Sequence, residues 1–233
     1  MTTRLAKYIA QSGLCSRRAA SRLIDAHRVT VNHRLANHID HVTDNDKICV
    51  DGEVLAPKAQ QLVLALNKPV GVDCNCDPTN PDSIVHIIAG DERVFPVGRL
   101  DKDSHGLMLL TNDGELCQQL LHPDFYHEKE YLVAVDRPFD ASFVSAMQQG
   151  VSIPQGITRP CSLLPVSDNQ FKLTLTQGWN RQIRKMCKQL GYRVIDLQRI
   201  RMVTIKLNAL PLGEIRRLSH EEVNTLSRAV QPI

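Results

Sequence analysis

Residues 57–61 form a polar, turn-prone stretch that separates two parts of the sequence with different hydrophobic patterns. This stretch lacks hydrophobic periodicity and begins with proline, which is typical of a linker. A continuous apolar run starts directly after it, at Leu62. A chain of 233 residues with 42% hydrophobic residues is long enough for a small domain and a larger one. We therefore expect one domain over residues 1–56 and a second over residues 62–233.

The first segment has the pattern of two helices followed by short strands. Each helix has apolar residues on one face: Leu5, Tyr8 and Ile9 in the first, and Ala20, Leu23 and Ile24 in the second. Gly13 is placed to end the first helix, and Ser16 is placed to cap the second. Strands are expected over Val29–Asn32 and Lys47–Val50, and Asp51-Gly52 favours a tight hairpin turn.

The second segment predicts more strands than helices. Strand patterns fall at Leu62–Leu66, Val94–Val97, Leu107–Leu110, Tyr131–Val135, Phe171–Thr176 and Arg201–Leu207. Helical patterns fall at Ser83–Ala89, Glu115–Leu121, Ala141–Gln148, Arg181–Leu190 and Glu221–Ala229. Strands and helices do not alternate regularly, so a doubly wound parallel sheet is disfavoured. The fold class expected for the chain is α+β, with a mostly antiparallel mixed sheet flanked by helices.

The distribution of charge says more than the net charge of +3. Residues 1–34 carry seven Lys and Arg residues against the single acid Asp25, and residues 178–217 carry ten against Asp196 and Glu214. Two cationic segments on a nearly neutral chain favour two surfaces that contact nucleic-acid phosphates. The alternative is a pair of solvated helix faces.

Several classes of protein are disfavoured. The seven cysteines are odd in number, and Cys74-x-Cys76 has no second cysteine pair or close histidine pair, so neither a disulfide framework nor a metal site is expected. No run approaches the roughly 18–20 apolar residues that cross a bilayer, and the N-terminus has no secretory signal. We expect a cytoplasmic monomer that does not bind a membrane.

The densest run of functional side chains covers Gly98–Gly106. It is a charged loop bracketed by glycines that leads into an apolar strand, a setting in which catalytic groups are common. Arg99 and Lys102 flank Asp101, and a neighbouring cation keeps a carboxylate ionised and available as a nucleophile or base. On these residues alone, a salt-bridged surface loop is the favoured interpretation and a catalytic loop is the alternative.

Four motifs in order show a strong resemblance to a known enzyme family. They are Leu66-Asn67-Lys68-Pro69-Val70-Gly71, Gly98-Arg99-Leu100-Asp101-Lys102-Asp103-Ser104-His105-Gly106, Glu128-Lys129-Glu130-Tyr131-Leu132-Val133 and Asn180-Arg181-Gln182-Ile183-Arg184-Lys185-Met186. Together they resemble the pseudouridine synthases of the branch that contains RsuA, RluB, RluE and RluF, with the closest likeness to the RluF group. Some relatives carry a long basic tail, whereas this sequence ends at Ile233, so we expect no RNA contact from such a tail.

The N-terminal segment resembles the alpha-L RNA-binding module of a small-subunit ribosomal protein and of several RNA-modifying enzymes. Its matching residues are Arg4-Leu5, Lys7-Tyr8-Ile9, Gly13, Cys15-Ser16-Arg17-Arg18, Val29 and Val31-Asn32. The turn after Val31 often carries glycine in that module, and here it reads Asn32-His33-Arg34. Asn32 is therefore expected to supply a positive φ.

The resemblance implies a role for each site residue. Asp101 would attack a flipped-out uridine so that the base detaches, turns and reattaches through carbon, and Arg184 would pair with Asp101. Tyr131 would pack on the target base, and Arg99 would fill the gap that the base leaves. Without the resemblance, Tyr131 would be a core residue, Arg184 a phosphate contact and Arg99 a partner of Asp101 or Asp103.

The resemblance also implies the substrate and the RNA-binding residues. The expected activity is isomerisation of uridine to pseudouridine in structured RNA, in large-subunit ribosomal RNA or also in tRNA, without a cofactor or metal. The expected RNA contacts, besides Arg99, are Arg4, Lys7, Arg17, Arg18, Arg22, Lys68, Arg181, Lys185 and Lys188. A non-catalytic RNA-binding or ribosome-assembly protein is the alternative. A zinc-dependent deaminase is disfavoured, because its His-x-Glu and Pro-Cys-x-x-Cys motifs are absent from the sequence.

Overall fold

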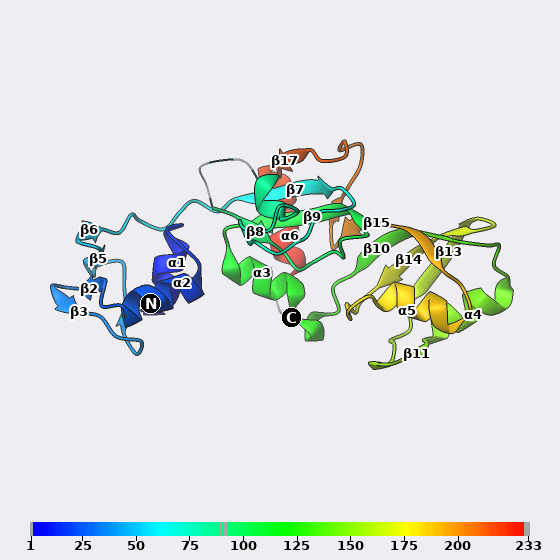
Figure 1. Cartoon of the computed structure of the whole chain (residues 1–233), viewed down its shortest axis with the longest axis horizontal. Coiled ribbons are helices and arrows are strands. Elements are labelled where there is room, and N and C mark those ends of the chain that lie inside the picture. The colour runs from blue at the N-terminus through cyan, green and yellow to red at the C-terminus, as the bar shows by residue number, and fades with distance from the viewer. Residues whose placement is uncertain (1, 89, 91–92, 231–233) are drawn as a thin grey trace. The chain divides into compact units, whose positions relative to one another are not determined.

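The computed structural model describes residues 2–88, 90 and 93–230. These residues form two compact units. The first contains the described residues within 1–62, 90–95 and 112–114, and the second contains those within 63–89, 96–111 and 115–233. Figure 1 labels the α-helices and most of the strands of both units. Among the described residues, no helix combines the length and the hydrophobicity that a membrane span requires.

The first unit has two helices and six short strands. Its elements are β1 (Thr3–Arg4), α1 (Leu5–Gln11), α2 (Arg17–Asp25), β2 (Val29–Val31), β3 (Arg34–Leu35), β4 (His41–Val42), β5 (Ile48–Val50) and β6 (Glu53–Val54). Four strands form a sheet in the order β3-β2-β5-β6, and β1 pairs with β4. The Ser16 side chain caps α2 by accepting a hydrogen bond from the Ala19 amide, as the sequence predicted.

Both hairpin turns of this unit have positive φ angles at two successive residues. The φ angles are 49° at Asn32, 69° at His33, 53° at Asp51 and 87° at Gly52. Such angles suit the tight turns whose twist matches that of antiparallel strands. The expectation for Asn32 is confirmed, and His33 shares the left-handed conformation with it.

The second unit is built on a long mixed sheet in the order β13-β14-β10-β15-β9-β7-β17, with β16 beside β15. The bounds are β7 (Val63–Lys68), β9 (His105–Thr111), β10 (Lys129–Val135), β13 (Ser162–Ser167), β14 (Gln170–Leu175), β15 (Val194–Met202), β16 (Ile205–Lys206) and β17 (Ile215–Arg217). Three shorter strands are β8 (Phe95–Pro96), β11 (Ser152–Ile153) and β12 (Gly156–Ile157), of which the last two pair with each other.

The helices of this unit occupy the positions that the hydrophobic periodicity predicts. They are α3 (Gly114–Leu121), α4 (Ala141–Gln149), α5 (Gln182–Gln189) and α6 (His220–Ala229), with the 3-10 turns η1 (Ile84–His86) and η2 (Pro123–Phe125). The helix expected over Ser83–Ala89 is therefore only a 3-10 turn, and Ala89 lies outside the described residues.

One pair of strands makes the sheet mixed. β15 and β9 are parallel, with Gln198 opposite His105 and Arg199 opposite Gly106, whereas the other neighbours along this sheet order are antiparallel. The α+β class with a mostly antiparallel mixed sheet is confirmed. A Cβ atom at position 106 would lie 2.4 Å from the carbonyl oxygen of Arg199, so only glycine allows this close approach.

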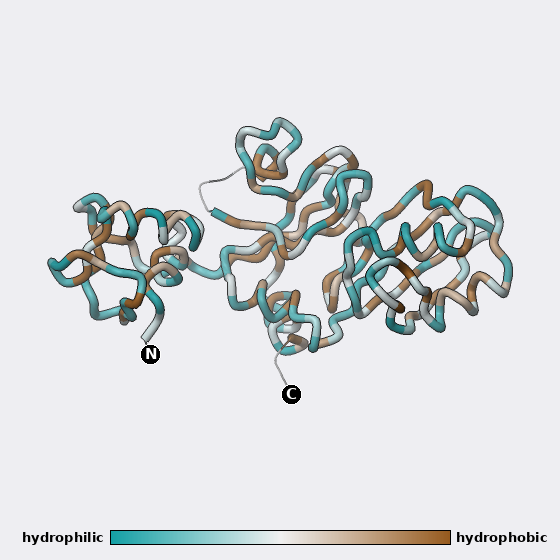
Figure 2. The backbone as a smooth tube through the Cα atoms, turned by 60° about the horizontal axis from the view of Figure 1, so that its bottom comes forward, coloured by the Kyte–Doolittle hydropathy of each residue, from teal (hydrophilic) through white to brown (hydrophobic). Residues whose placement is uncertain are grey.

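Two hydrophobic clusters hold the sheet. One packs α4 and α5 against β10, β14 and β15 and contains Val133, Phe143, Met147, Phe171 and Met186. The other, which contains Leu107, Leu109 and Leu226, packs α3 and α6 against β7 and β9. Figure 2 shows hydrophobic residues along the strands and polar residues in the connecting loops. The two halves of the sheet thus each have their own hydrophobic core.

The strand expected over Arg201–Leu207 is wrong. β15 ends at Met202, and the chain reverses at Val203, whose φ is 53°, before β16 begins at Ile205. Val203 is β-branched, so no local preference indicated a turn at this position. Most of β15 and the whole of β13 were not predicted, because polar residues interrupt the hydrophobic pattern of β15 and Pro165 interrupts that of β13.

Candidate active site

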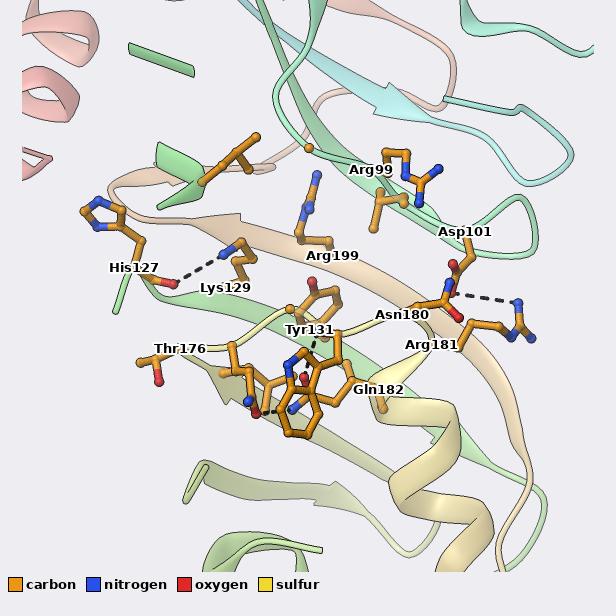
Figure 3. Close-up of a pocket in the computed structure, with 18 of the residues that line it drawn as sticks. Arg99, Asp101, His127, Lys129, Tyr131, Thr176, Asn180, Arg181, Gln182 and Arg199 are labelled. Atoms are coloured by element: carbon orange, nitrogen blue, oxygen red, sulfur yellow. Dashed lines mark hydrogen bonds and ion pairs between the residues drawn. The ribbon is translucent and has the colours of Figure 1, made fainter. Parts of the chain in front are cut away.

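A cavity of about 540 Å³ opens in the second unit, beside the loop that precedes β9. Its walls are formed by that loop, by β10 and β15, and by the segment from Leu175 to Ile183 that ends β14 and begins α5. Figure 3 shows the side chains that line it. The volume lies in the range of pockets that hold small organic molecules, so a single nucleoside can be accommodated.

The loop that carries Asp101 is held at several points by the segment after β7. Cys74 contacts Leu100 twice: its sulfur lies 3.3 Å from the Leu100 carbonyl oxygen and 3.4 Å from the Leu100 amide nitrogen. The Gly71 amide donates to the Lys102 carbonyl at 2.7 Å. Within the loop, the Ser104 amide donates to the Asp101 carbonyl at 3.0 Å. These bonds fix the backbone on both sides of Asp101, whose side chain remains 28% exposed and lines the cavity.

Lys68 is placed differently from the expectation that it contacts RNA. Its side chain is fully buried, and its ammonium donates to the carbonyls of Pro69 and Val72, each at 2.9 Å. Burial lowers the pKa of Lys68. A buried ammonium cannot reach an RNA phosphate, so Lys68 instead closes the turn that carries Gly71 and supports the Asp101 loop.

Tyr131 projects into the cavity from β10. Val133 and Val135 follow it on the same face of the strand and are buried in the core, and Tyr131 at the cavity end is only partly buried. Its neighbour across the sheet is Arg199. Figure 3 shows Tyr131 and Asp101 facing the same space from different elements. The structure therefore brings the two predicted residues to one site.

Arg181 and Arg184 contact the loop in a way that corrects the predicted pair. The Nη1 atom of Arg181 lies 3.8 Å from Asp101 Oδ2, and both Nη atoms donate to Asp103, at 3.0 and 2.8 Å. Arg184 donates to the Asp103 carbonyl at 2.8 Å and to Ser104 Oγ at 3.2 Å, and its Nε lies 3.4 Å from Asp103 Oδ2. Among the described residues, the arginine within ion-pair distance of Asp101 is thus Arg181.

Arg181 also affects the ionisation of the Asp103 carboxyl group. Its hydrogen bonds, together with the charges of both arginines, hold the pKa of Asp103 below its usual value. Arg181 itself has a φ of 52° and precedes the first turn of α5 without capping it. This left-handed conformation directs the side chain toward the loop, and no sequence pattern indicated it.

The remaining predicted RNA contacts are distributed as follows. Arg99 is exposed and lines the cavity. On α5, Lys188 is exposed, whereas Lys185 is partly buried and donates to the Asn180 carbonyl at 2.7 Å. Ile183, Met186 and Cys187 are buried beneath them, as the helical pattern predicted.

In the first unit, four of the five predicted contacts are exposed arginines: Arg4, Arg17, Arg18 and Arg22. Lys7 is partly buried. The exposed arginines of α2 occupy one stretch of the helix, and Ala20 and Ile24 on its other face are buried in the core of this unit.

Three cavity residues were missed by the sequence analysis. Lys129 lies two residues before Tyr131 on the same strand, so period-two alternation could have placed it on the same face. Arg159 and Arg199 also line the cavity, and no motif marked them. Arg159 lies over the Tyr126 ring, 4.0 Å from its centroid, and donates to the carbonyls of Pro123 and Thr176 at the cavity rim, each at 3.3 Å.

Comparison with known proteins identifies two family regions. Residues 62–189 match the RNA pseudouridylate synthase family, and residues 3–48 match the S4 domain. The chain is 43% identical over 232 residues to the dual-specificity RNA pseudouridine synthase RluF of Escherichia coli (strain K12), a match that covers 99% of this chain and 80% of the relative. It is 33% identical to the ribosomal large subunit pseudouridine synthase B of Bacillus subtilis (strain 168), over 96% of this chain and 95% of the relative.

A solved structure agrees with these sequence matches. The crystal structure of a pseudouridylate synthase superposes with a TM-score of 0.70 at 28% identity and covers 96% of this chain and 99% of that one. The family match spans more than half of the chain, and the relatives match nearly all of it. The chain is therefore an RNA pseudouridine synthase that carries an S4 domain.

Proposed function

We propose that this enzyme converts a uridine of large-subunit ribosomal RNA to pseudouridine, with Asp101 as the nucleophile that attacks the flipped-out nucleotide. The observation that carries the proposal is the position of Asp101: a partly exposed carboxylate on a fixed loop, facing Tyr131 across a cavity of nucleoside size. A base inside a duplex could not reach this carboxylate, so the nucleotide has to leave the stack.

The role of each residue follows from its chemistry. The carboxylate of Asp101 can bond to the sugar and depart again, and the cation of Arg181 beside it favours the ionised form. Tyr131 offers a flat face to the detached base and a hydroxyl at its tip. Arg184 acts through the backbone of the loop, because its bonds run to Asp103 and Ser104. Arg99, exposed at the cavity, is placed to occupy the gap left by the flipped base.

The names of the relatives support the choice of RNA. The Bacillus subtilis relative is a ribosomal large subunit enzyme, and the Escherichia coli relative is a dual-specificity RNA enzyme. Ribosomal RNA is the first substrate of the proposal, and tRNA is a second. The protein would act as a monomer in the cytoplasm, without a cofactor or metal.

The module of residues 1–56, joined by residues 57–61 to the catalytic domain of residues 62–233, supplies a second RNA contact in this proposal. The exposed arginines of α2 would bind the phosphate backbone. Arg4 and Lys7 would add to this surface, and Lys185 and Lys188 would bind RNA beside the cavity.

The experiment compares Asp101→Asn with Asp168→Asn, an exposed aspartate outside the cavity. Ribosomal RNA and tRNA from a deletion strain are mapped for pseudouridine after complementation with each form. Wild type and Asp168→Asn should restore one or more sites, whereas Asp101→Asn should restore none, with a loss of at least about 10³-fold in rate. Restoration by Asp101→Asn would refute the nucleophile, and a site found only in tRNA would refute the choice of RNA.

A further inference from the structure

The cavity has an unusual balance of charge. Of the described residues that line it, Asp101 is the one carboxylate, and the Lys and Arg side chains are Arg99, Lys129, Arg159, Arg181 and Arg199. Asp103 offsets the charge of Arg181 from outside the cavity. The other four cations are in no described ion pair: Arg99 is exposed, Lys129 and Arg159 are partly buried, and Arg199 is buried. Lys129 and Arg199 are thus neighbouring cations, partly or fully buried in the cavity wall, without an acidic partner.

Lys129 begins β10, two residues before Tyr131 on the same face. It is partly buried, and the nearest hydrogen-bond partner of its Nζ is the His127 carbonyl, at 3.5 Å. Burial, and after it the charge of Arg199, lowers the pKa of Lys129 to about 8. Since no carboxylate offsets these two effects, the ammonium lies in a site that disfavours its charge.

Arg199 is the fixed cation behind Lys129. Its side chain is 2% exposed, its Nε donates to the Leu107 carbonyl at 2.6 Å, and its Nη2 lies 3.6 Å from Met108 Sδ. Neither partner is charged, so neither offsets the positive charge of the guanidinium. The absence of a side chain at Gly106 lets the Arg199 backbone approach β9 this closely.

A register shift between β10 and β15 separates these cations from the acids of the same strands. Glu130 lies opposite Arg201, but Tyr131 lies opposite Arg199 and not opposite Ile200, which a regular register would place there. Bulges of this kind turn the following side chains to the other face. Arg201 accordingly binds Glu128 at 2.9 Å and Glu130 at 3.1 Å, away from the cavity lining. Glu128 and Glu130 thus neutralise Arg201 on the face away from the cavity, and not Lys129 or Arg199.

The remaining titratable groups around Lys129 do not neutralise it either. Burial and the charge of Lys129 lower the pKa of His127, which keeps its ring neutral, and His127 Nε2 is buried without a hydrogen-bond partner among the described residues. The other charged or titratable groups that line the cavity are Arg99, Asp101, His122, Tyr131, Arg159 and Arg181.

Unpaired cations in a partly dry site are unfavourable until an anion enters. From this arrangement we propose that Lys129, with Arg199 behind it, binds the uracil ring and stabilises the negative charge that the ring acquires when its bond to the ribose breaks. The proposal rests on the proposed function of Asp101. Donors fixed in advance where charge develops are a large source of rate enhancement.

The step balances as an isomerisation. The C1′–N1 bond breaks as an Asp101 oxygen bonds to C1′, and the electron pair of the broken bond remains on the ring, shared by N1 and the two carbonyl oxygens. Lys129 faces that charge while the ring turns. A ring electron pair then forms the C5–C1′ bond, Asp101 leaves with its own pair, the proton on C5 passes to water and N1 takes up a proton. No oxidant or further reactant is needed.

The test compares Lys129→Met and Lys129→Arg with Lys172→Met, an exposed lysine on the adjacent strand β14. Large-subunit ribosomal RNA transcribed with tritium at C5 of uridine is mixed with excess enzyme, and tritium release gives the single-turnover rate. Lys129→Met should lose about 100-fold in rate with an RNA affinity within threefold of wild type. Lys172→Met should match wild type in both.

A pH profile of kcat/KM provides a second readout that does not need the methionine variant to fold. The charged form of Lys129 is the active one, so the wild-type rate should fall as the pH rises through about 8. Lys129→Arg keeps its charge at this pH, so its rate should stay level between pH 7 and 9. A fall that both proteins share comes from another group, such as the uridine itself, and would count against the proposal.

Two further outcomes would overturn the proposal. One is a Lys129→Met rate within threefold of Lys172→Met. The other is a Lys129→Met variant whose rate at saturation is normal but whose RNA affinity drops tenfold, which would make the lysine a phosphate contact. Asp101→Asn distinguishes the two proposals. If this variant remains active, Asp101 is not the nucleophile and the proposed function fails. If Asp101→Asn is inactive while Lys129→Met keeps the wild-type rate, only the inference about Lys129 fails.

Discussion

The guanidinium of Arg181 lies 3.8 Å from the carboxylate of Asp101, measured from Nη1 to Oδ2. The same guanidinium holds Asp103 with two hydrogen bonds, so it links the start of α5 to the loop of the proposed nucleophile. Two parallel hydrogen bonds fix direction as well as distance. Arg181 therefore helps to hold the loop of Asp101 in place, although its side chain does not cap α5.

Substitution of Arg181 should affect chemistry more than folding. Arg181→Ala removes the cation beside Asp101 and the fork on Asp103, and we expect kcat/KM to fall by about 30-fold, or about 2 kcal/mol. Arg181→Lys should recover only part of this, because an ammonium cannot form the paired bonds. Single-turnover assays measure both effects. Equal rates for Arg181→Lys and wild type would show that the charge alone is needed.

The arginines of α2 should control the salt dependence of RNA binding. Arg17, Arg18 and Arg22 are exposed, and no described ion pair includes them. Conversion of all three to glutamine should weaken RNA binding and reduce the slope of log K against log salt by up to about 2–3, because fewer counterions are displaced. Arg28→Gln is the matched control, since Arg28 is already paired with Asp51. Filter binding across salt concentrations would measure the slopes, and an unchanged slope in the triple variant would exclude this surface.

Gly106 should tolerate no side chain. Gly106→Ala would place Cβ 2.4 Å from the Arg199 carbonyl oxygen at a φ of 101°, and we expect a loss of about 3 kcal/mol or more in the free energy of unfolding. Gly114→Ala is the control, because a Cβ there has no atom within 4 Å and φ is not positive. That variant should lie within about 0.5–1 kcal/mol of wild type. Urea titration compares the three proteins, and equal destabilisation by both changes would contradict the close approach of β15 to β9.

Local pattern predicted much of the molecule. The apolar spacing of α5 placed Ile183, Met186 and Cys187 in the core, and the capping serine placed the start of α2. These features depend on residues within about one turn of each other, so they can be inferred without knowledge of the rest of the chain. The family motifs likewise identified Asp101 and Tyr131 as site residues, although these two residues lie on different elements.

The sequence by itself determined the fold class, the family and the meeting of Asp101 and Tyr131 at one cavity, because periodicity, turn residues and motifs are local properties of the chain. Only the tertiary structure decided which arginine approaches Asp101, that Lys68 is buried, and that Lys129 and Arg199 share one wall without an acid. The first depends on the left-handed conformation of Arg181, the second on the turn whose carbonyls accept from Lys68, and the third on a close backbone approach and a register shift between distant strands. Such features change the direction of a side chain without changing the local pattern, so they become visible only when the distant segments are packed together.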